Sequence, residues 1–221
     1  MFDSFWLKNI FSYEYPYGIR LEAFVEKESF FSARRITWMS ILMALVIVLQ
    51  SFGGVINIGP VQLNFTLIPI VLGAVVLGPV SGAILGLASG IVVTVQVIMG
   101  LVPFYTLIWT YSPVVALLTC IIKSTAAGLV AGLLYKWISK KNSVVALFVA
   151  SAAVPIVNTA LFIVGCLCMW DTIAMAAGGT DVFGFILVSL VTFNFFVELG
   201  VNLLLSPPLS KVIDVIEKRL G

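Results

Sequence analysis

Asn64-Phe-Thr-Leu-Ile-Pro-Ile-Val-Leu-Gly-Ala-Val-Val-Leu-Gly-Pro-Val-Ser-Gly-Ala-Ile-Leu-Gly-Leu-Ala-Ser-Gly90 is an uncharged, almost wholly apolar stretch, and the rest of the chain is organised around it. Pro69 and the pair Gly78-Pro79 interrupt the stretch, so its two halves are too closely spaced to form one uniform helix. It therefore predicts a helical hairpin inside a lipid bilayer, where helices satisfy their own backbone groups.

Glycine recurs at every fourth position in this stretch, as Gly78, Gly82, Gly86 and Gly90. On a helix this spacing makes a strip without side chains, which a neighbouring backbone can approach closely. We therefore expect these glycines to pack against another helix rather than to face lipid.

The composition indicates an integral membrane protein. Of the 221 residues, 61% are hydrophobic and 10% are charged, whereas soluble domains carry about 25% charged residues. A spanning helix needs roughly 20 mainly apolar residues, so the chain has room for about six spans in one bundle. The net charge of +2 is too small to indicate a nucleic-acid partner.

The predicted fold is all-α, a bundle of six transmembrane helices with cytoplasmic N- and C-termini. The expected spans are residues 36–52, 65–78, 80–100, 113–135, 144–169 and 182–206, the last one stopped by Pro207-Pro208. Six spans place both termini on one side, and 11 of the 12 Lys and Arg residues fall on that side. The opposite loops carry only Asp171 and Asp181, so the positive-inside rule places the termini in the cytoplasm.

Two segments flank the predicted membrane domain, residues 36–206. Residues 1–35 mix basic and acidic residues and are expected to be cytoplasmic or interfacial, either as a short helix lying on the membrane or as a flexible tail. Residues 207–221 carry apolar residues at helical spacing, which predicts a cytoplasmic amphipathic tail.

Residues that the sequence lacks exclude several kinds of chemistry. There is no histidine, which excludes Ser-His-Asp triads and histidine-based zinc sites, and no Gly-x-x-x-x-Gly-Lys-Ser/Thr loop for ATP phosphates. Cys120, Cys166 and Cys168 lie in apolar segments and are interpreted as packing residues. We therefore expect no enzyme activity, catalytic residue, metal or cofactor, and active transport would need an energising partner.

Two ionisable residues, Lys123 and Glu198, fall inside predicted spans, where a charge costs roughly 2.5 kcal/mol or more unless it is paired or functional. In one interpretation they neutralise each other within the bundle. In the other, Lys123 faces an outward-open cavity and contacts an anionic group of a ligand. Asn158 and Asn194 are expected at nearly the same depth, which favours a cavity, although each amide could instead bond to a neighbouring helix.

Aromatic and amide residues mark the expected outer end of this cavity. Phe104, Tyr105, Trp109 and Tyr111 lie between the third and fourth spans, where aromatic residues also serve as ordinary interface anchors. The predicted ligand-binding residues are Asn57, Asn64, Gln96, Tyr105, Trp109, Lys123, Asn158 and Asn194.

Over about residues 36–206, the chain resembles the substrate-binding S components of energy-coupling factor (ECF) transporters, the vitamin-uptake systems of bacteria and archaea. The resemblance rests mainly on Leu63-Asn-Phe-Thr-Leu-Ile-Pro-Ile-Val-Leu-Gly-Ala-Val-Val-Leu-Gly-Pro-Val-Ser-Gly-Ala83, with its Ile-Pro and Gly-Pro-x-x-Gly pattern. The family docks on its coupling subunit through an Ala-x-x-x-Ala motif in the first span. Here that motif is matched by Ser40-Ile-Leu-Met-Ala44, with serine in place of the first alanine.

The resemblance implies a cell-membrane protein that works with a transmembrane coupling protein and two ATPase subunits. It also implies a vitamin site in the outer half, under the loop between the first two spans. Lys123 suggests a carboxylate ligand, and pantothenate is the favoured vitamin, with riboflavin or another B vitamin as alternatives. A stand-alone secondary transporter and a membrane-embedded enzyme are further alternatives, which the lack of internal repeats and of catalytic groups disfavours.

Overall fold

The computed structural model describes residues 33–53, 57–58, 61–62 and 64–220. The chain separates into two compact units, residues 1–33 and 34–221, and the helix bundle belongs to the second unit. The expectations for residues 1–32 therefore lie outside the described residues.

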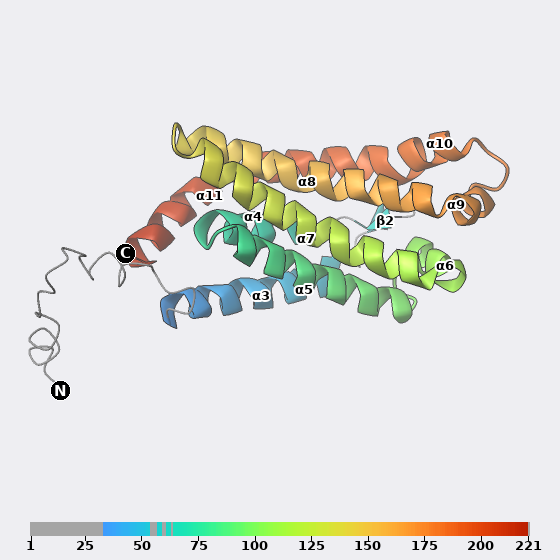
Figure 1. The fold of residues 1–221 in the computed structure, drawn as a ribbon, viewed down its shortest axis with the longest axis horizontal. Coiled ribbons are helices and arrows are strands. Elements are labelled where there is room, and N and C mark those ends of the chain that lie inside the picture. Colours follow the sequence, from blue (N-terminus) through green and yellow to red (C-terminus); the bar gives the residue numbers. More distant parts are fainter. Residues whose placement is uncertain (1–32, 54–56, 59–60, 63, 221) are drawn as a thin grey trace, which may run out of the picture. The chain divides into compact units, whose positions relative to one another are not determined.

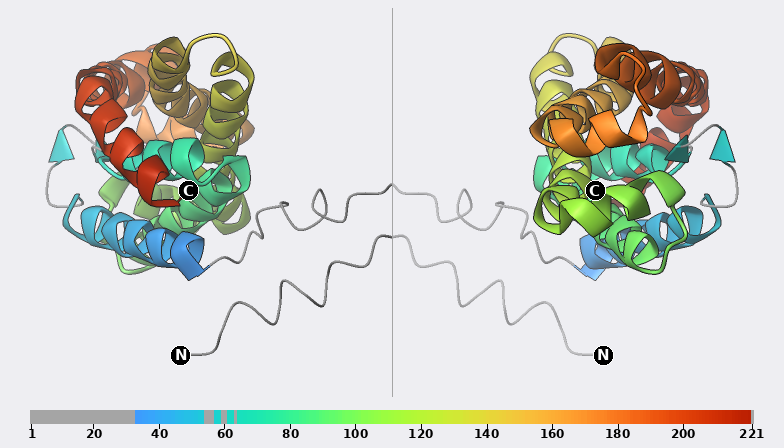
Figure 2. Two further views of the ribbon diagram at one scale, coloured as in Figure 1. Left: turned by 90° about the vertical axis from the view of Figure 1, so that its left-hand side faces the viewer. Right: turned by 90° about the vertical axis from the view of Figure 1, so that its right-hand side faces the viewer.

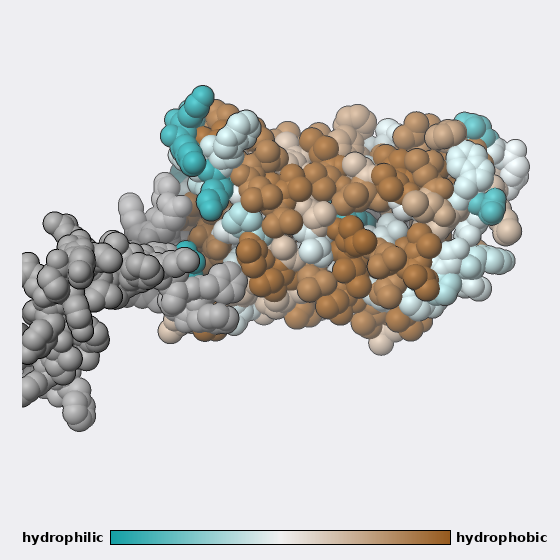
Figure 3. Space-filling view, viewed as in Figure 1, coloured by the Kyte–Doolittle hydropathy of each residue, from teal (hydrophilic) through white to brown (hydrophobic). Residues whose placement is uncertain are grey.

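The described part of the chain is almost entirely helical, and five of its helical runs are long and apolar enough to cross a membrane. These runs are α3 (Ala33–Gly53), α5 (Pro79–Ile98), α7 (Pro113–Ile138), α8 (Ser143–Cys168) and the continuous run of α10 (Val182–Gly184), η1 (Phe185–Thr192) and α11 (Phe193–Leu220). Figure 3 shows a hydrophobic surface over the middle of the visible face, with hydrophilic residues gathered at its two ends. The predicted all-α membrane fold is confirmed.

The second of the six predicted spans differs from the others, because α4 (Leu67–Val76) has only ten residues. At 1.5 Å per residue it is about 15 Å long, half of a hydrocarbon core of about 30 Å. Pro69 lies in its first turn, and Gly78-Pro79 begins α5 two residues after it ends. Most of its residues are buried, and it packs among α5, α7, α8 and α11, as the end-on views of Figure 2 show. The six predicted helices are therefore five full spans and, at the short second span of residues 65–78, a buried half-helix.

The connections contain four short elements. A two-residue antiparallel ladder joins β1 (Asn57–Ile58) to β2 (Val61–Gln62) between α3 and α4. Helix α6 (Pro103–Tyr111) precedes α7, and α9 (Trp170–Ala176) follows α8. Proline occupies the first turn of α5, α6 and α7, where its missing N–H costs no helical hydrogen bond.

The chain passes back and forth so that α3 begins at the same end of the bundle at which α11 finishes (Figure 1). That end also holds the turn between α7 and α8 with Lys136, Lys140 and Lys141, and we call it the basic end. The opposite end carries α6, α9 and the acidic residues Asp171 and Asp181. The predicted separation of charge between the two ends is confirmed for these residues.

The glycine strip packs α5 directly against the backbone of α7. A Cβ on Gly82 would lie 2.6 Å from the Gly128 carbonyl oxygen, and one on Gly90 would lie 2.7 Å from the Cys120 carbonyl oxygen. A Cβ on Gly86 would collide with the carbonyl of Ser124. Gly78 is different, since nothing lies within 4 Å of its Cβ position and its φ of 98° requires glycine. The expectation therefore holds for Gly82, Gly86 and Gly90, whereas Gly78 is needed for the turn between α4 and α5.

Two separate apolar cores stack along the bundle. The core nearer the basic end includes Leu85, Ala127 and Val154, and the other includes Val93, Cys120 and Phe162. Between these positions, each of α5, α7 and α8 carries a polar residue: Ser89, Lys123 and Asn158 respectively. The helices thus place one polar layer between the two cores.

Helix α11 does not stop at Pro207-Pro208, contrary to the prediction, but continues to Leu220. Two prolines remove two backbone donors and favour a bend over a straight continuation. Side chains bond to backbone carbonyls on both sides of the pair, from Ser206 to Asn202 at 2.9 Å and from Ser210 to Pro207 at 2.8 Å. Figure 1 shows the end of α11 turning away from the helices beside it.

Candidate ligand cavity

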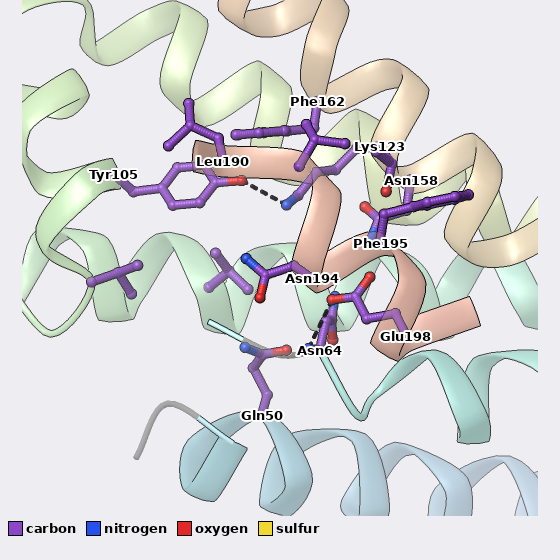
Figure 4. Close-up of a pocket in the computed structure, with 14 residues that line it drawn as sticks. Gln50, Asn64, Tyr105, Lys123, Asn158, Phe162, Leu190, Asn194, Phe195 and Glu198 are labelled. Carbon is purple, nitrogen blue, oxygen red and sulfur yellow. Dashed lines mark hydrogen bonds between the residues drawn. The ribbon is translucent and has the colours of Figure 1, made fainter. Parts of the chain in front are cut away.

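A cavity of about 60 Å³ lies in the polar layer and draws residues from nearly every helix of the bundle (Figure 4). Its lining residues are Gln50, Asn64, Val93, Val102, Tyr105, Lys123, Asn158, Thr159, Phe162, Leu190, Val191, Asn194, Phe195 and Glu198. Polar amides and two opposite charges thus share one cavity with aromatic and aliphatic side chains. This is the usual make-up of a small-molecule site.

Lys123 reaches the cavity from the middle of α7 and is held by aromatic groups. Its Nζ donates a hydrogen bond of 2.7 Å to the Tyr105 hydroxyl and lies 5.0 Å from the Tyr105 ring centroid and 5.4 Å from that of Phe162. Both distances are within the range of cation–π attraction. Burial raises the pKa of the Tyr105 hydroxyl above its ordinary value, so this phenol stays neutral beside the ammonium.

Glu198 reaches the same cavity from α11 and contacts the chain just before α4. Its Oε1 accepts a hydrogen bond of 2.9 Å from the backbone N–H of Asn64. Among the described residues, Lys123 and Glu198 form no ion pair within 4.0 Å, and Figure 4 shows the Lys123 ammonium turned towards Tyr105 instead. Direct neutralisation of the two charges, one of the two interpretations of the sequence, is therefore not seen.

Asn158 and Asn194 bring two unsatisfied amides to the cavity. Their exposed fractions are 4% and 7%, and neither Oδ1 has a hydrogen-bond partner within the described ranges. A buried acceptor without a partner costs roughly 1–3 kcal/mol, which a bound donor would recover. These two oxygens are therefore able to accept hydrogen bonds from a molecule in the cavity.

A network of polar side chains closes the cavity on the side of α3. The Gln50 Oε1 accepts hydrogen bonds of 3.3 Å from the hydroxyls of Thr66 and Ser89. Gln96 donates a bond of 2.9 Å to the Gln50 backbone carbonyl, and its Oε1 accepts one of 3.3 Å from Gln50 Nε2. The hydroxyl of Thr66 also contacts Asn64 Oδ1 and lies 3.0 Å from the Ser89 hydroxyl. The network fixes the end of α3 to α4 and α5.

The structure brings five of the eight predicted ligand residues to the cavity: Asn64, Tyr105, Lys123, Asn158 and Asn194. Gln96 lies behind the wall in the Gln50 network, and Trp109 packs on the apolar core near α6 and α9. The backbone of Asn57 pairs with Gln62 in the β ladder, and its side chain lies outside the described residues.

The cavity also contains residues that were not predicted to contact a ligand. Glu198 was recognised as a charge in a span but was not assigned to the site, and Gln50 was overlooked although it is a polar residue near the end of an apolar span. Leu190 and Val191 belong to the π-helix η1, where Thr192 donates to the Leu187 carbonyl at 2.6 Å. Such π-helical turns are frequent at functional sites, but their position is not evident from hydropathy.

The two predicted docking residues lie on the surface of α3. Ser40 and Ala44 are both exposed, one turn apart, and the Ser40 hydroxyl donates to the Ile36 carbonyl at 2.9 Å. Since Ser40 satisfies its hydroxyl within its own helix, the pair presents a surface of small residues to its surroundings.

Neither metal binding nor covalent chemistry is indicated within the described part of the chain. No group of three or more His, Cys, Asp or Glu residues there could hold a metal ion, and the three cysteines are free. The charges, amides and aromatic rings of the cavity can contact the polar and apolar parts of a small solute.

Comparison with known proteins agrees with this arrangement. No curated protein gives a significant match to the chain. The family model for the substrate-specific component of ECF transporters matches residues 34–210, which include the whole predicted membrane domain, residues 36–206, and every residue that lines the cavity. Because the match covers most of the 221 residues, the chain belongs to the family of ECF transporter substrate-specific components.

Proposed function

We propose that this substrate-specific component captures a small water-soluble vitamin or related solute that carries a carboxylate, and that pantothenate is the first candidate. The observation that carries the proposal is Lys123, an ammonium in the wall of a cavity between two apolar cores. In such surroundings an anionic group of a solute would stabilise the charge far more than it would in water.

Pantothenate fits this arrangement in several respects. Its carboxylate would contact Lys123 and the Tyr105 hydroxyl, and its amide and hydroxyl groups would serve as donors to Asn158 and Asn194. The unsatisfied Oδ1 atoms of these two residues support a ligand with donors of this kind.

Riboflavin is the second candidate, and a specific feature of the cavity favours it. Phe162 and Phe195, which were not among the predicted ligand residues, line the cavity together with Tyr105. Flat rings stack on such side chains. A ring-bearing B vitamin is therefore more compatible with this site than the sequence alone indicated.

Release into the cell would depend on partners, which we propose to be a transmembrane coupling protein and two ATPase subunits. The exposed Ser40 and Ala44 on α3 would form the surface that docks on the coupling protein. The basic end would face the cytoplasm of a bacterial or archaeal cell and the cavity would fill from outside, as Lys136, Lys140 and Lys141 support through the positive-inside rule.

Two measurements test this function. Mass spectrometry of small molecules retained by the purified protein should identify a carboxylate-bearing solute. Vesicles that contain the chain together with a coupling protein and ATPases should accumulate labelled pantothenate or riboflavin only when ATP is present. Concentrative uptake by the chain alone would contradict the proposal and favour a secondary transporter.

A further inference from the structure

We infer that the cavity selects a bipolar solute, whose anionic group contacts Lys123 and whose cationic nitrogen contacts Glu198. This inference rests on the proposed capture function but not on pantothenate or riboflavin as the solute, because it adds a required cationic nitrogen that neither vitamin carries. It is carried by the unpaired opposite charges of the cavity and by the unsatisfied acceptor of Asn194 on the same helix face as Glu198.

The two charges of the cavity have partners that do not neutralise them. Lys123 donates to the neutral hydroxyl of Tyr105, and Glu198 accepts one hydrogen bond from the backbone of Asn64. The other oxygen of Glu198, Oε2, accepts no hydrogen bond from any described residue. Both side chains line the same space, so a solute there can contact both.

The charge balance of the cavity decides which solutes fit. Lys123 and Glu198 together contribute no net charge, so a monoanion leaves an excess of one negative charge and a monocation an excess of one positive charge. A single uncompensated charge in a membrane bundle is unfavourable, because lipid and apolar side chains do not solvate it. A zwitterion adds no net charge and offers a counter-ion to each side chain.

One unsatisfied acceptor lies beside Glu198. Asn194 precedes Glu198 by four residues on α11, so the two side chains lie on the same face of that helix. The Oδ1 atom of Asn194 lacks a partner among the described residues, so an ammonium with several N–H groups can bond to it as well as to Glu198. An asparagine amide can present either its oxygen or its nitrogen by rotation, whereas an ionised carboxylate can only accept hydrogen bonds. Glu198 therefore determines that the part of the cavity beside it binds a donor.

Apolar side chains would contact the middle of the solute. Phe162, Leu190 and Phe195 line the cavity together with the charged residues. The inferred ligand therefore has an anionic end, a cationic nitrogen and an apolar body. Pantothenate supplies only the first charge, and its binding would leave Glu198 without a counter-ion unless that carboxylate took up a proton.

A series of matched probes tests the inference on the purified full-length protein. The probes are ω-amino acids from β-alanine to 6-aminohexanoate, each compared with the alkanoate in which a methyl group replaces the ammonium. The series scans the separation of the two charges. For at least one length, we expect the amino acid to bind wild-type protein about tenfold more tightly than its alkanoate, measured by its effect on thermal unfolding.

Variants assign the two charges to residues. In Glu198→Gln the preference for the amino acid should disappear, and the alkanoate should bind at least as tightly as it binds wild type. In Lys123→Met, n-alkylamines of matched length should bind better than alkanoates. Asp171→Asn is the matched control, because it removes an exposed acid that does not line the cavity and should keep the wild-type preference.

Equal effects of amino acids and alkanoates on wild-type protein at every length, including no effect of either, would overturn the inference without any variant. An unchanged preference in Glu198→Gln would also overturn it. The capture function fails separately, when the complex reconstituted with its partners takes up no solute. If uptake occurs without the charge preference, only the bipolar assignment is wrong.

Discussion

Lys123 on α7 and Glu198 on α11 line one cavity but contact different partners. The Lys123 ammonium donates to the Tyr105 hydroxyl at 2.7 Å, and the Glu198 carboxylate accepts from the Asn64 N–H at 2.9 Å. Two opposite charges inside a membrane bundle would normally pair, because each is costly alone. Their separation keeps a strong field in the space between them. That field would be lost in a bundle built only for stability.

Replacement of Lys123 by alanine should weaken pantothenate binding at least tenfold, about 1.4 kcal/mol, because the ammonium would contact the carboxylate. Lys136→Ala is a matched control, since Lys136 belongs to the same helix but lies exposed at the basic end. Titration calorimetry measures both variants. An unchanged affinity with a lower thermal midpoint would show that Lys123 has only a structural role.

Tyr105→Phe should have a smaller effect than Tyr105→Leu. Phenylalanine keeps a ring near Lys123 but loses the 2.7 Å hydrogen bond and the proposed contact of the hydroxyl with the carboxylate, for which we expect a loss of affinity of up to about tenfold. Leucine removes the cation–π contact as well, which adds roughly 0.5–2 kcal/mol. Equal affinities of the two variants would contradict a contribution from the ring.

Gly86→Ala should destabilise the bundle by about 1–3 kcal/mol, because its Cβ would collide with the Ser124 carbonyl on α7. Gly200→Ala is the control on another helix. Nothing lies within 4 Å of its Cβ position, and alanine should be neutral or stabilising there by up to about 1 kcal/mol. Thermal unfolding in detergent should therefore show a lower midpoint for Gly86→Ala than for Gly200→Ala. Equal decreases of the midpoint in both variants would contradict the close contact of Gly86 with α7.

Ala44→Trp should abolish energised uptake while leaving solute binding intact, because a large side chain would block docking of the coupling protein at the exposed face of α3. Val164→Trp places the same bulk at an exposed position of α8 and should keep uptake. Co-purification with the coupling protein provides a second readout. Loss of both binding and uptake in Ala44→Trp would refute the docking role.

The depth of the polar residues could be predicted from the sequence, because a helix rises by a constant 1.5 Å per residue. Lys123, Asn158 and Asn194 were expected at similar depth, and they line one cavity. The glycine spacing likewise predicted the close helix contact, which the structure confirms at Gly82, Gly86 and Gly90.

Other features depend on tertiary contacts that hydropathy does not encode. The short length of α4 is tolerated because surrounding helices bury it, and helix α11 passes Pro207-Pro208 by bending. Gln50 could not be assigned from its own position, because its role arises from bonds to Thr66, Ser89 and Gln96 on other segments. The contact of Glu198 with Asn64 joins residues 134 positions apart and has no local signal.

The contact between α5 and α7 is stiffer than the wall of the cavity. Gly82 and Gly128 touch through backbone atoms, which cannot change rotamer, whereas the residues around the cavity are long side chains and a π-helical turn that can adjust. A solute can therefore shift the side chains and the π-helical turn that line the cavity. The helices that are joined by backbone contacts would move together as a rigid unit. Any reshaping on capture would reach the opposite end as a tilt of whole helices.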